Sequence, residues 1–90
     1  MKLVDIVAFI EPKETILGFP EIEITELAID SRKVKDAAHT LFFAIETEKN
    51  DGHLYVLQLY HAGVRNFVIT KVMREFAECT EANFLFVDDS

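Results

Sequence analysis

The sequence predicts an α/β fold, a layered domain with a mixed sheet of about four or five strands flanked by short helices. In the second half of the chain, apolar runs typical of buried strands alternate with short helical patterns. The 90 residues are 50% hydrophobic and 28% charged, which is the composition of a globular chain that can bury one modest core. We therefore expect residues 1–90 to form a single domain.

Two segments carry clear helical patterns. Apolar residues at spacings of three and four predict a helix over residues 2–10, which Pro12 ends. A second helix is predicted over residues 53–62. Asp51 is its candidate N-cap, and Gly63 lies where a left-handed residue is favoured after the last turn.

A third, shorter helix is predicted over residues 71–79, with Val72, Phe76 and Cys79 on its apolar side. Because Cys79 is the only cysteine, an internal disulfide is excluded, and the chain suits a reducing cytoplasm.

The strands are predicted from runs of β-branched, aromatic and aliphatic residues. In chain order they are residues 15–17, residues 21–25 as an edge strand continued in extended form through 27–29, then 40–45, 66–70 and 83–87. The last three are apolar on both faces, which favours the interior of a sheet. Their phenylalanines should form most of the core: Phe42, Phe43, Phe67, Phe84 and Phe86.

Charge and length exclude two classes of partner. The net charge of −7 leaves no excess of cations for a nucleic-acid backbone. No uninterrupted apolar stretch exceeds five residues, so we expect no membrane partner. The segment 31–35 is nevertheless locally basic, with three cations and no acid, and could meet a small anion.

The motifs of nucleotide hydrolysis and metal binding are missing from the sequence. No two of the three glycines are close enough to form a phosphate-binding loop, so neither an ATP site nor a dinucleotide site is predicted. The histidines lie 14 and 8 residues apart without a cysteine cluster, which is not a zinc pattern. We predict no catalytic residue, no metal and no cofactor in this chain.

Two polar segments remain as candidates for a binding site. Residues 30–32, Asp-Ser-Arg, follow one predicted strand, and residues 50–53, Asn-Asp-Gly-His, open a predicted helix. Ser31 can donate and accept a hydrogen bond, Arg32 has a five-donor fork, and a helix start offers free N–H groups to an anion. From the residues alone, an ordinary turn and an ordinary N-cap explain the two segments equally well.

The run AIDSRKVKDAAHTLFFAIETEKNDGHLYVLQLYHAGVRNFVIT, residues 28–70, resembles the N-terminal domain of the Mur ligases, which extend peptidoglycan precursors. The resemblance depends on a D-S-R strand end, an L-F-x-A strand and a D-G-H helix start in this order and at this spacing. The amino-acid sequence of this run is most similar to that of the branch that adds D-alanyl-D-alanine, in the variety fused to an alanine racemase.

This resemblance implies a role in substrate recognition. The family's N-terminal domain binds the uridine diphosphate end of UDP-N-acetylmuramoyl-peptide, and a central domain of the same parent chain binds ATP and Mg²⁺. Residues 1–90 would then be an inactive fragment of a multidomain, cytoplasmic, ATP-dependent amide-bond ligase. A racemase fusion would add pyridoxal phosphate to the parent's cofactors.

The resemblance also assigns roles to the two polar segments. Ser31 would contact the uridine or the diphosphate, and Ile29 would lie against the uracil. The loop before the helix would contact the nucleotide, shaped by the Asp-Gly pair, with the histidine beginning the helix behind it. The candidate substrate-binding residues are Ile29, Ser31, Arg32, Glu48, Lys49, Asn50, Asp51, Gly52 and His53.

The alternative is a free-standing, acidic α/β protein-interaction module without a small-molecule site. The parent gene would separate the two hypotheses, because a P-loop shortly after Ser90 would support the ligase. The acidic pair Asp88-Asp89 is predicted to be an exit linker and not a Mg²⁺ site.

Overall fold

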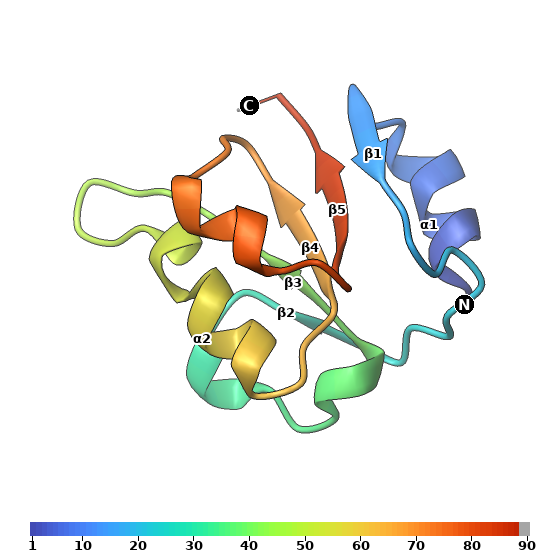
Figure 1. The fold of residues 1–90 in the computed structure, drawn as a ribbon, viewed down its shortest axis with the longest axis horizontal. Coiled ribbons are helices and arrows are strands. Elements are labelled where there is room, and N and C mark those ends of the chain that lie inside the picture. Colours follow the sequence, from blue (N-terminus) through green and yellow to red (C-terminus); the bar gives the residue numbers. More distant parts are fainter. Residues whose placement is uncertain (89–90) are drawn as a thin grey trace.

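The computed structural model describes residues 1–88, which form one five-stranded sheet with short helices on both faces (Figure 1). The strands are β1 (Glu14–Ile16), β2 (Glu26–Ala28), β3 (Thr40–Phe43), β4 (Asn66–Ile69) and β5 (Asn83–Phe86), in the order β1-β5-β4-β3-β2. Strands β2 to β5 are parallel, and β1 is antiparallel to β5. The predicted α/β domain with a mixed sheet is confirmed.

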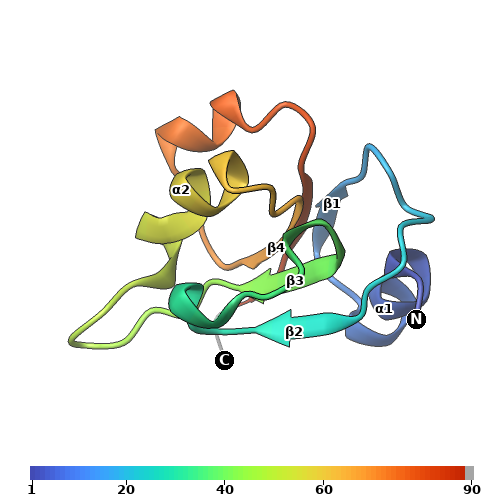
Figure 2. The ribbon, with the colours of Figure 1, turned by 90° about the horizontal axis from the view of Figure 1, so that it is seen from below.

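Helices cover the two faces of the sheet unequally (Figure 2). Helix α1 (Leu3–Ile10) lies on one face, and α2 (Val56–His61) lies on the other with the 3₁₀ helix η4 (Arg74–Glu78). The 3₁₀ helix η3 (Gly52–Tyr55) leads directly into α2. Two further 3₁₀ helices, η1 (Ser31–Lys33) and η2 (Ala37–His39), lie in the connection from β2 to β3.

Each central strand contributes side chains to two cores, because successive strand residues point to opposite faces. The core under α2 and η4 contains Phe42, Phe67 and Phe84. The core under α1 contains Leu41, Val68 and Leu85. The prediction that central-strand phenylalanines are buried is confirmed for Phe42, Phe67 and Phe84, whereas Phe43 and Phe86 are only partly buried.

Stacked aromatic rings form the centre of the larger core. Phe84 stacks on Phe67 with ring centroids 5.5 Å apart and on Phe76 at 5.4 Å. Phe42 meets Phe67 edge to face at 6.4 Å. Phe76 comes from η4, so this stack joins the helical layer to the sheet through large buried apolar surfaces.

Two buried asparagines hold the amino ends of the parallel strands together. Asn83 donates to the side-chain oxygen of Asn66 at 2.8 Å, and Asn66 donates to the carbonyl of Thr40 at 3.0 Å. The Oδ1 of Asn83 accepts the backbone N–H groups of Gly18 and Phe19. The amides thus fix the turn after β1 against the sheet, and burial is favourable because their polar atoms are paired.

The predicted edge strand over residues 21–25 is wrong. This segment hydrogen-bonds to the start of the chain: Leu3 donates to Ile22, and Ile24 donates to the carbonyl of Met1. Its backbone groups are therefore used outside the sheet, and the edge strand β2 begins only at Glu26.

The first predicted helix is confirmed as α1, whereas the second and third are tighter or shorter than expected. The second begins with the 3₁₀ turn η3, and the third is entirely the 3₁₀ helix η4. Asp51 caps η3 by accepting the N–H of His53, and Gly63 has a φ of 111°, as predicted. Phe76 and Cys79 are buried, but Val72 is 72% exposed, because it precedes η4 and does not share its apolar side.

Within residues 1–88, none of the helices has the length and apolar character needed to cross a membrane. In this part of the chain, no group of three or more metal-ligating side chains is arranged to hold an ion. Asp88 pairs with Lys13 at 2.9 Å, and its neighbour in the acidic pair, Asp89, lies outside the described residues.

We expect Phe67→Ala to lower the free energy of unfolding by about 3–5 kcal/mol, because it leaves a cavity at the centre of the ring stack. Small domains have about 5–15 kcal/mol in total. The variant should therefore be largely insoluble or lose its cooperative thermal transition. Phe9→Ala is the control, since Phe9 is 86% exposed. A melt of Phe67→Ala within a few degrees of the wild type would contradict its place in the core.

Candidate functional site

The two polar segments lie at the same edge of the sheet. Strands β2 and β3 are parallel neighbours, so the residues that follow them meet where open α/β sheets commonly bind ligands. There they line one open cavity of about 560 Å³. Its lining residues are Ile29, Asp30, Ser31, Arg32, Ile45, Asn50, Gly52, Tyr55 and Gln58. The two polar segments therefore lie at one cavity.

On the β2 side of the cavity, Arg32 is paired with Asp30. The carboxylate of Asp30 accepts the backbone N–H of Arg32 at 2.9 Å and its Nε and Nη2 at 3.1 and 3.0 Å. These hydrogen bonds lower the pKa of Asp30 from 3.8 to about 2. Two of the five N–H donors of the Arg32 guanidinium thus meet a neighbouring carboxylate, and the side chain is 86% exposed.

On the β3 side, residues 46–51 form a hairpin that projects beyond the sheet, the yellow-green loop in Figures 1 and 2. The N–H of Thr47 donates to the carbonyl of Asn50 at 2.7 Å. Asn50 lines the cavity, whereas Glu48 and Lys49 are exposed at the tip and are not among its lining residues. Of the predicted loop contacts, only Asn50 is therefore placed at the cavity.

Gly52 permits the close approach between the helix start and the end of β3. It is buried, and its N–H donates to the carbonyl of Ile45 at 2.8 Å. A Cβ atom at this position would lie 2.9 Å from the backbone nitrogen of Ile45 and 3.1 Å from the Cα of Ala44. Any larger residue would push the second segment away from the strand.

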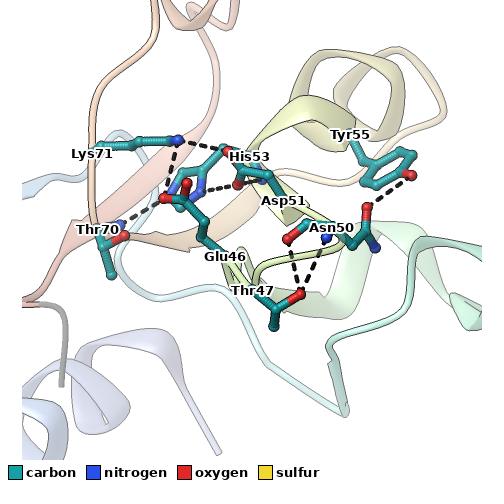
Figure 3. Close-up of polar contacts among 8 residues, drawn as sticks. All are labelled: Glu46, Thr47, Asn50, Asp51, His53, Tyr55, Thr70 and Lys71. Atoms are coloured by element: carbon teal, nitrogen blue, oxygen red, sulfur yellow. Dashed lines mark hydrogen bonds and ion pairs between the residues drawn. The ribbon is translucent and has the colours of Figure 1, made fainter.

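The carboxylate of Asp51 joins three parts of the chain (Figure 3). It accepts the backbone N–H of His53 at 3.0 Å, the Nδ1 of His53 at 2.8 Å and the Nζ of Lys71 at 2.6 Å. Lys71 also donates to Glu46 at 3.2 Å. Burial by itself would raise the pKa of Asp51, but the hydrogen bonds from Lys71 and His53 lower it to about 2.

His53 acts behind the cavity and not in it. Its side chain is fully buried and stacks on Phe76 with ring centroids 6.4 Å apart. Its Nε2 accepts the N–H of Thr70 at 3.0 Å, so the ring proton is assigned to Nδ1, which donates to Asp51. Both ring nitrogens are occupied, and the imidazole links the helix start to the end of β4.

The expectation that the helix start offers free N–H groups to an anion is wrong. The N–H of Gly52 donates to Ile45, that of His53 to the Asp51 carboxylate, and that of Leu54 to the Asp51 carbonyl at 3.1 Å. The first donors of η3 are thus satisfied within the protein.

Three cavity residues escaped the sequence analysis: Ile45, Tyr55 and Gln58. Tyr55 and Gln58 are three residues apart, so a helix beginning near Asp51 places them on one face. That spacing was a usable signal. The hydroxyl of Tyr55 donates to the Oδ1 of Asn50 at 3.3 Å, which orients the amide beside the cavity.

The cavity combines apolar surface with uncharged hydrogen-bonding groups. Ile29 and Ile45 are 67% and 49% exposed, so both can cover a flat ring. The hydroxyl of Ser31 and the amides of Asn50 and Gln58 offer donors and acceptors to its polar edge. Most of the lining is polar, and the two isoleucines supply the apolar surface.

No family model matches the chain. Two curated proteins are similar to it in sequence. UDP-N-acetylmuramoyl-L-alanyl-D-glutamate–2,6-diaminopimelate ligase 1 of Clostridium acetobutylicum is 38% identical over 80 residues. The UDP-N-acetylmuramoyl-L-alanyl-D-glutamate–2,6-diaminopimelate ligase of Bacteroides fragilis is 37% identical over 78 residues. The matches cover 89% and 87% of this chain but only 16% of each relative.

A solved structure shares the fold. The crystal structure of MurF from Acinetobacter baumannii superimposes with a TM-score of 0.74 and 20% sequence identity, over 98% of this chain and 18% of that one. The chain is therefore similar in sequence to two UDP-N-acetylmuramoyl-peptide ligases and in fold to MurF. The chain spans about one sixth of the length of the curated relatives.

We expect Asp51→Asn to be destabilised at neutral pH, because its amide cannot pair with both Lys71 and His53. The pKa of Asp51 is lowered from 3.8 to about 2, so the stabilisation is fully present above about pH 4 and is lost as the pH falls toward 2. The shift corresponds to roughly 2 kcal/mol.

Urea unfolding of wild type and Asp51→Asn between pH 2 and 7 would measure this difference. The gap between the two should narrow at acid pH, whereas the exposed control Glu21→Gln should stay close to wild type at every pH. A constant gap down to pH 2 would mean that the ionised carboxylate is not the stabilising form.

Proposed function

We propose that this chain is the domain of a Mur ligase that receives the uridine end of UDP-N-acetylmuramoyl-peptide. The observation that carries the proposal is the meeting of the Asp-Ser-Arg and Asn-Asp-Gly-His segments in one cavity at the carboxyl edge of the sheet. The sequence likeness to two UDP-N-acetylmuramoyl-peptide ligases supplies the ligand class.

In this proposal the uracil lies between the aliphatic side chains at the two strand ends. Ile29 and Ile45 cover the ring, and Asn50 and Gln58 meet its carbonyl and N–H groups. Ser31 bonds to the ribose or to the first phosphate. Asp51 and His53 lie behind the cavity and hold the loop in place, and Gly52, which lines the cavity, allows the loop to approach the end of β3. Glu48 and Lys49 at the hairpin tip would act only if the loop folded over the ligand.

The rest of the parent enzyme belongs to the same proposal. A central domain would bind ATP and Mg²⁺ and carry out amide-bond formation in the cytoplasm, with residues 1–90 as its substrate-recognition domain. Two hypotheses remain for the group that the parent ligase adds to its substrate. One is D-alanyl-D-alanine, in a ligase fused to an alanine racemase that would contain pyridoxal phosphate. The names of the curated relatives favour 2,6-diaminopimelate as the other.

A free-standing acidic interaction module is the second candidate. The chain's charge of −7 and its exposed apolar side chains, such as Phe9 and Leu27, are compatible with protein binding. Such a module would not need Ser31 and Asn50 to line one cavity, and a nucleotide titration separates the two hypotheses.

Titration of the ¹⁵N-labelled chain with UDP should shift backbone amides at residues 29–32, 45 and 50–58. We expect a dissociation constant on the order of millimolar, because an open cavity buries few ligand contacts. Ser31→Ala should weaken binding by about 0.5–1.5 kcal/mol, the usual net value of one hydrogen bond. The absence of shifts at several millimolar UDP would reject the nucleotide site and favour the interaction module.

Residues 1–90 alone should not hydrolyse ATP or form an amide bond. Acyl-phosphate chemistry requires bound ATP, Mg²⁺ and a positioned amine, and the sequence contains no glycine-rich phosphate loop. A coupled phosphate-release assay on the purified chain would check this, with heat-unfolded protein as the blank. ATP turnover above that blank, retained through two purification schemes, would refute the assignment of catalysis to another domain.

A further inference from the structure

Helix α1 is too small to cover its face of the five-stranded sheet (Figure 2). Its buried side chains pack against Leu41, Val68 and Leu85, which belong to the three central strands. A helix is about 10 Å wide and neighbouring strands are about 4.8 Å apart, so one helix covers roughly two or three strands. On this face, the surface over the edge strand β2 is therefore not covered by a helix of residues 1–88.

An apolar groove of about 540 Å³ lies between α1 and β2. Leu27 pairs in register with Leu41, so its side chain points to the α1 face of the sheet, where it is 65% exposed. The apolar side chains along the groove include Ile6, Phe9, Ile10, Ile24, Leu27 and Phe43. The groove is thus built from the helix on one side and from strand ends on the other.

The outer side of α1 is also apolar. The helix has the sequence LVDIVAFI, in which Asp5 is the only charged residue. Phe9 stands at the groove and is 86% exposed. A helix that is apolar all round is normally buried all round, so the exposed side of α1 and the groove beside it call for a covering partner.

Covering the groove would not bury an unpaired charge. Glu26 lines the groove, but its carboxylate accepts the hydroxyl of Thr40 at 2.6 Å and two backbone N–H groups of the following loop at 3.0 and 3.1 Å. The amino group of Met1 is paired with the carboxylate of Glu23. The charged groups at this surface thus have partners already, and an unpaired charge is the costliest group to bury.

The exposed apolar area at the groove is close to that of a dimer interface. Met1, Phe9 and Leu27 are 66%, 86% and 65% exposed, and we call them together with the groove the α1 patch. If a whole large apolar side chain has about 200 Å² of surface, the α1 patch presents roughly 500 Å² of apolar area. A dimer interface of standard size buries about 800 Å² per partner, of which about 65% is apolar in homodimers. Two such patches would therefore supply the apolar area that a stable dimer needs.

We propose that a second copy of this chain covers the α1 patch, in a twofold dimer in which Phe9 of each copy enters the groove of the other. A twofold interface requires one surface that complements itself, and the α1 patch carries a projecting ring and a groove side by side. The groove shares no lining residue with the cavity at the ends of β2 and β3. The dimer therefore goes beyond the proposed function and does not depend on it.

Sedimentation equilibrium of the purified chain, from micromolar to millimolar concentration, should show a monomer–dimer equilibrium with a dissociation constant on the order of 10 µM. Phe9→Asp and Leu27→Asp each place a carboxylate in the apolar contact and should weaken the dimer at least about 10-fold. The matched control is Val72→Asp, which adds the same charge at a side chain that is 72% exposed and lies outside the groove. Its dissociation constant should stay within about twofold of the wild type. Thermal melts of all three variants should remain cooperative, because the altered side chains are exposed.

An isotope-filtered NOE experiment on a mixture of labelled and unlabelled chains tests the arrangement itself. We expect cross-peaks between the ring of Phe9 in one copy and the methyl groups of Leu27 in the other. A chain that is monomeric at millimolar concentration overturns the proposal. So does a dimer that Phe9→Asp and Leu27→Asp leave intact, that Val72→Asp weakens equally, or that lacks these cross-peaks.

The outcomes for the two proposals are distinct. Phe9→Asp should bind UDP as the wild type does, because Phe9 does not line the cavity. A dimer that does not bind UDP supports the α1 interface and rejects the nucleotide site. Binding of UDP by a chain that stays monomeric does the reverse.

Discussion

The geometry of the site depends on one carboxylate, that of Asp51. This carboxylate accepts hydrogen bonds from the start of η3 and from Lys71 beyond the end of β4. The backbone of Asp51 also closes the hairpin, opposite Glu46. His53 completes the connection, because its ring lies between Asp51 and the N–H of Thr70. Three segments that are distant in sequence thereby hold a common position, and Asn50 is carried to the cavity by its neighbour in the chain.

The same hydrogen bonds determine which chemistry the site offers. A helix start usually presents free N–H groups to an anion. Here those donors hold the hairpin and the cap in place, so the groups that remain exposed to the cavity are side chains, among them Ser31, Arg32 and Asn50. On the other side of the cavity, Asp30 accepts hydrogen bonds from two of the five N–H donors of the Arg32 guanidinium, which is otherwise exposed.

The two ends of the parallel sheet have different roles because all four parallel strands point the same way. At their amino ends, the buried amides of Asn66 and Asn83 join neighbouring strands and hold the turn after β1. At their carboxyl ends, the chain leaves the sheet in polar loops that surround the cavity. Buried amide hydrogen bonds therefore join the strands at one edge of the sheet, and the cavity lies at the other. MurF from Acinetobacter baumannii shares the fold at 20% sequence identity, so the fold itself tolerates extensive sequence change.

Local patterns in the sequence determined most of the secondary structure. The interior strands, the cap at Asp51 and the left-handed Gly63 follow from apolar runs and residue chemistry that act within a few positions. The two polar segments were likewise visible as candidates. Their meeting in one cavity required the parallel pairing of β2 with β3, which neither segment encodes alone.

Tertiary structure alone decided what individual polar groups do. The burial of His53 depends on Phe76 and Thr70, which lie 23 and 17 positions further along the chain. The missing edge strand over residues 21–25 depends on competition from residues 1–3 for the same backbone groups. A sequence pattern records which hydrogen-bonding groups are present. Only the folded chain selects their partners, because every donor and acceptor has several possible partners until long-range packing fixes the distances between them.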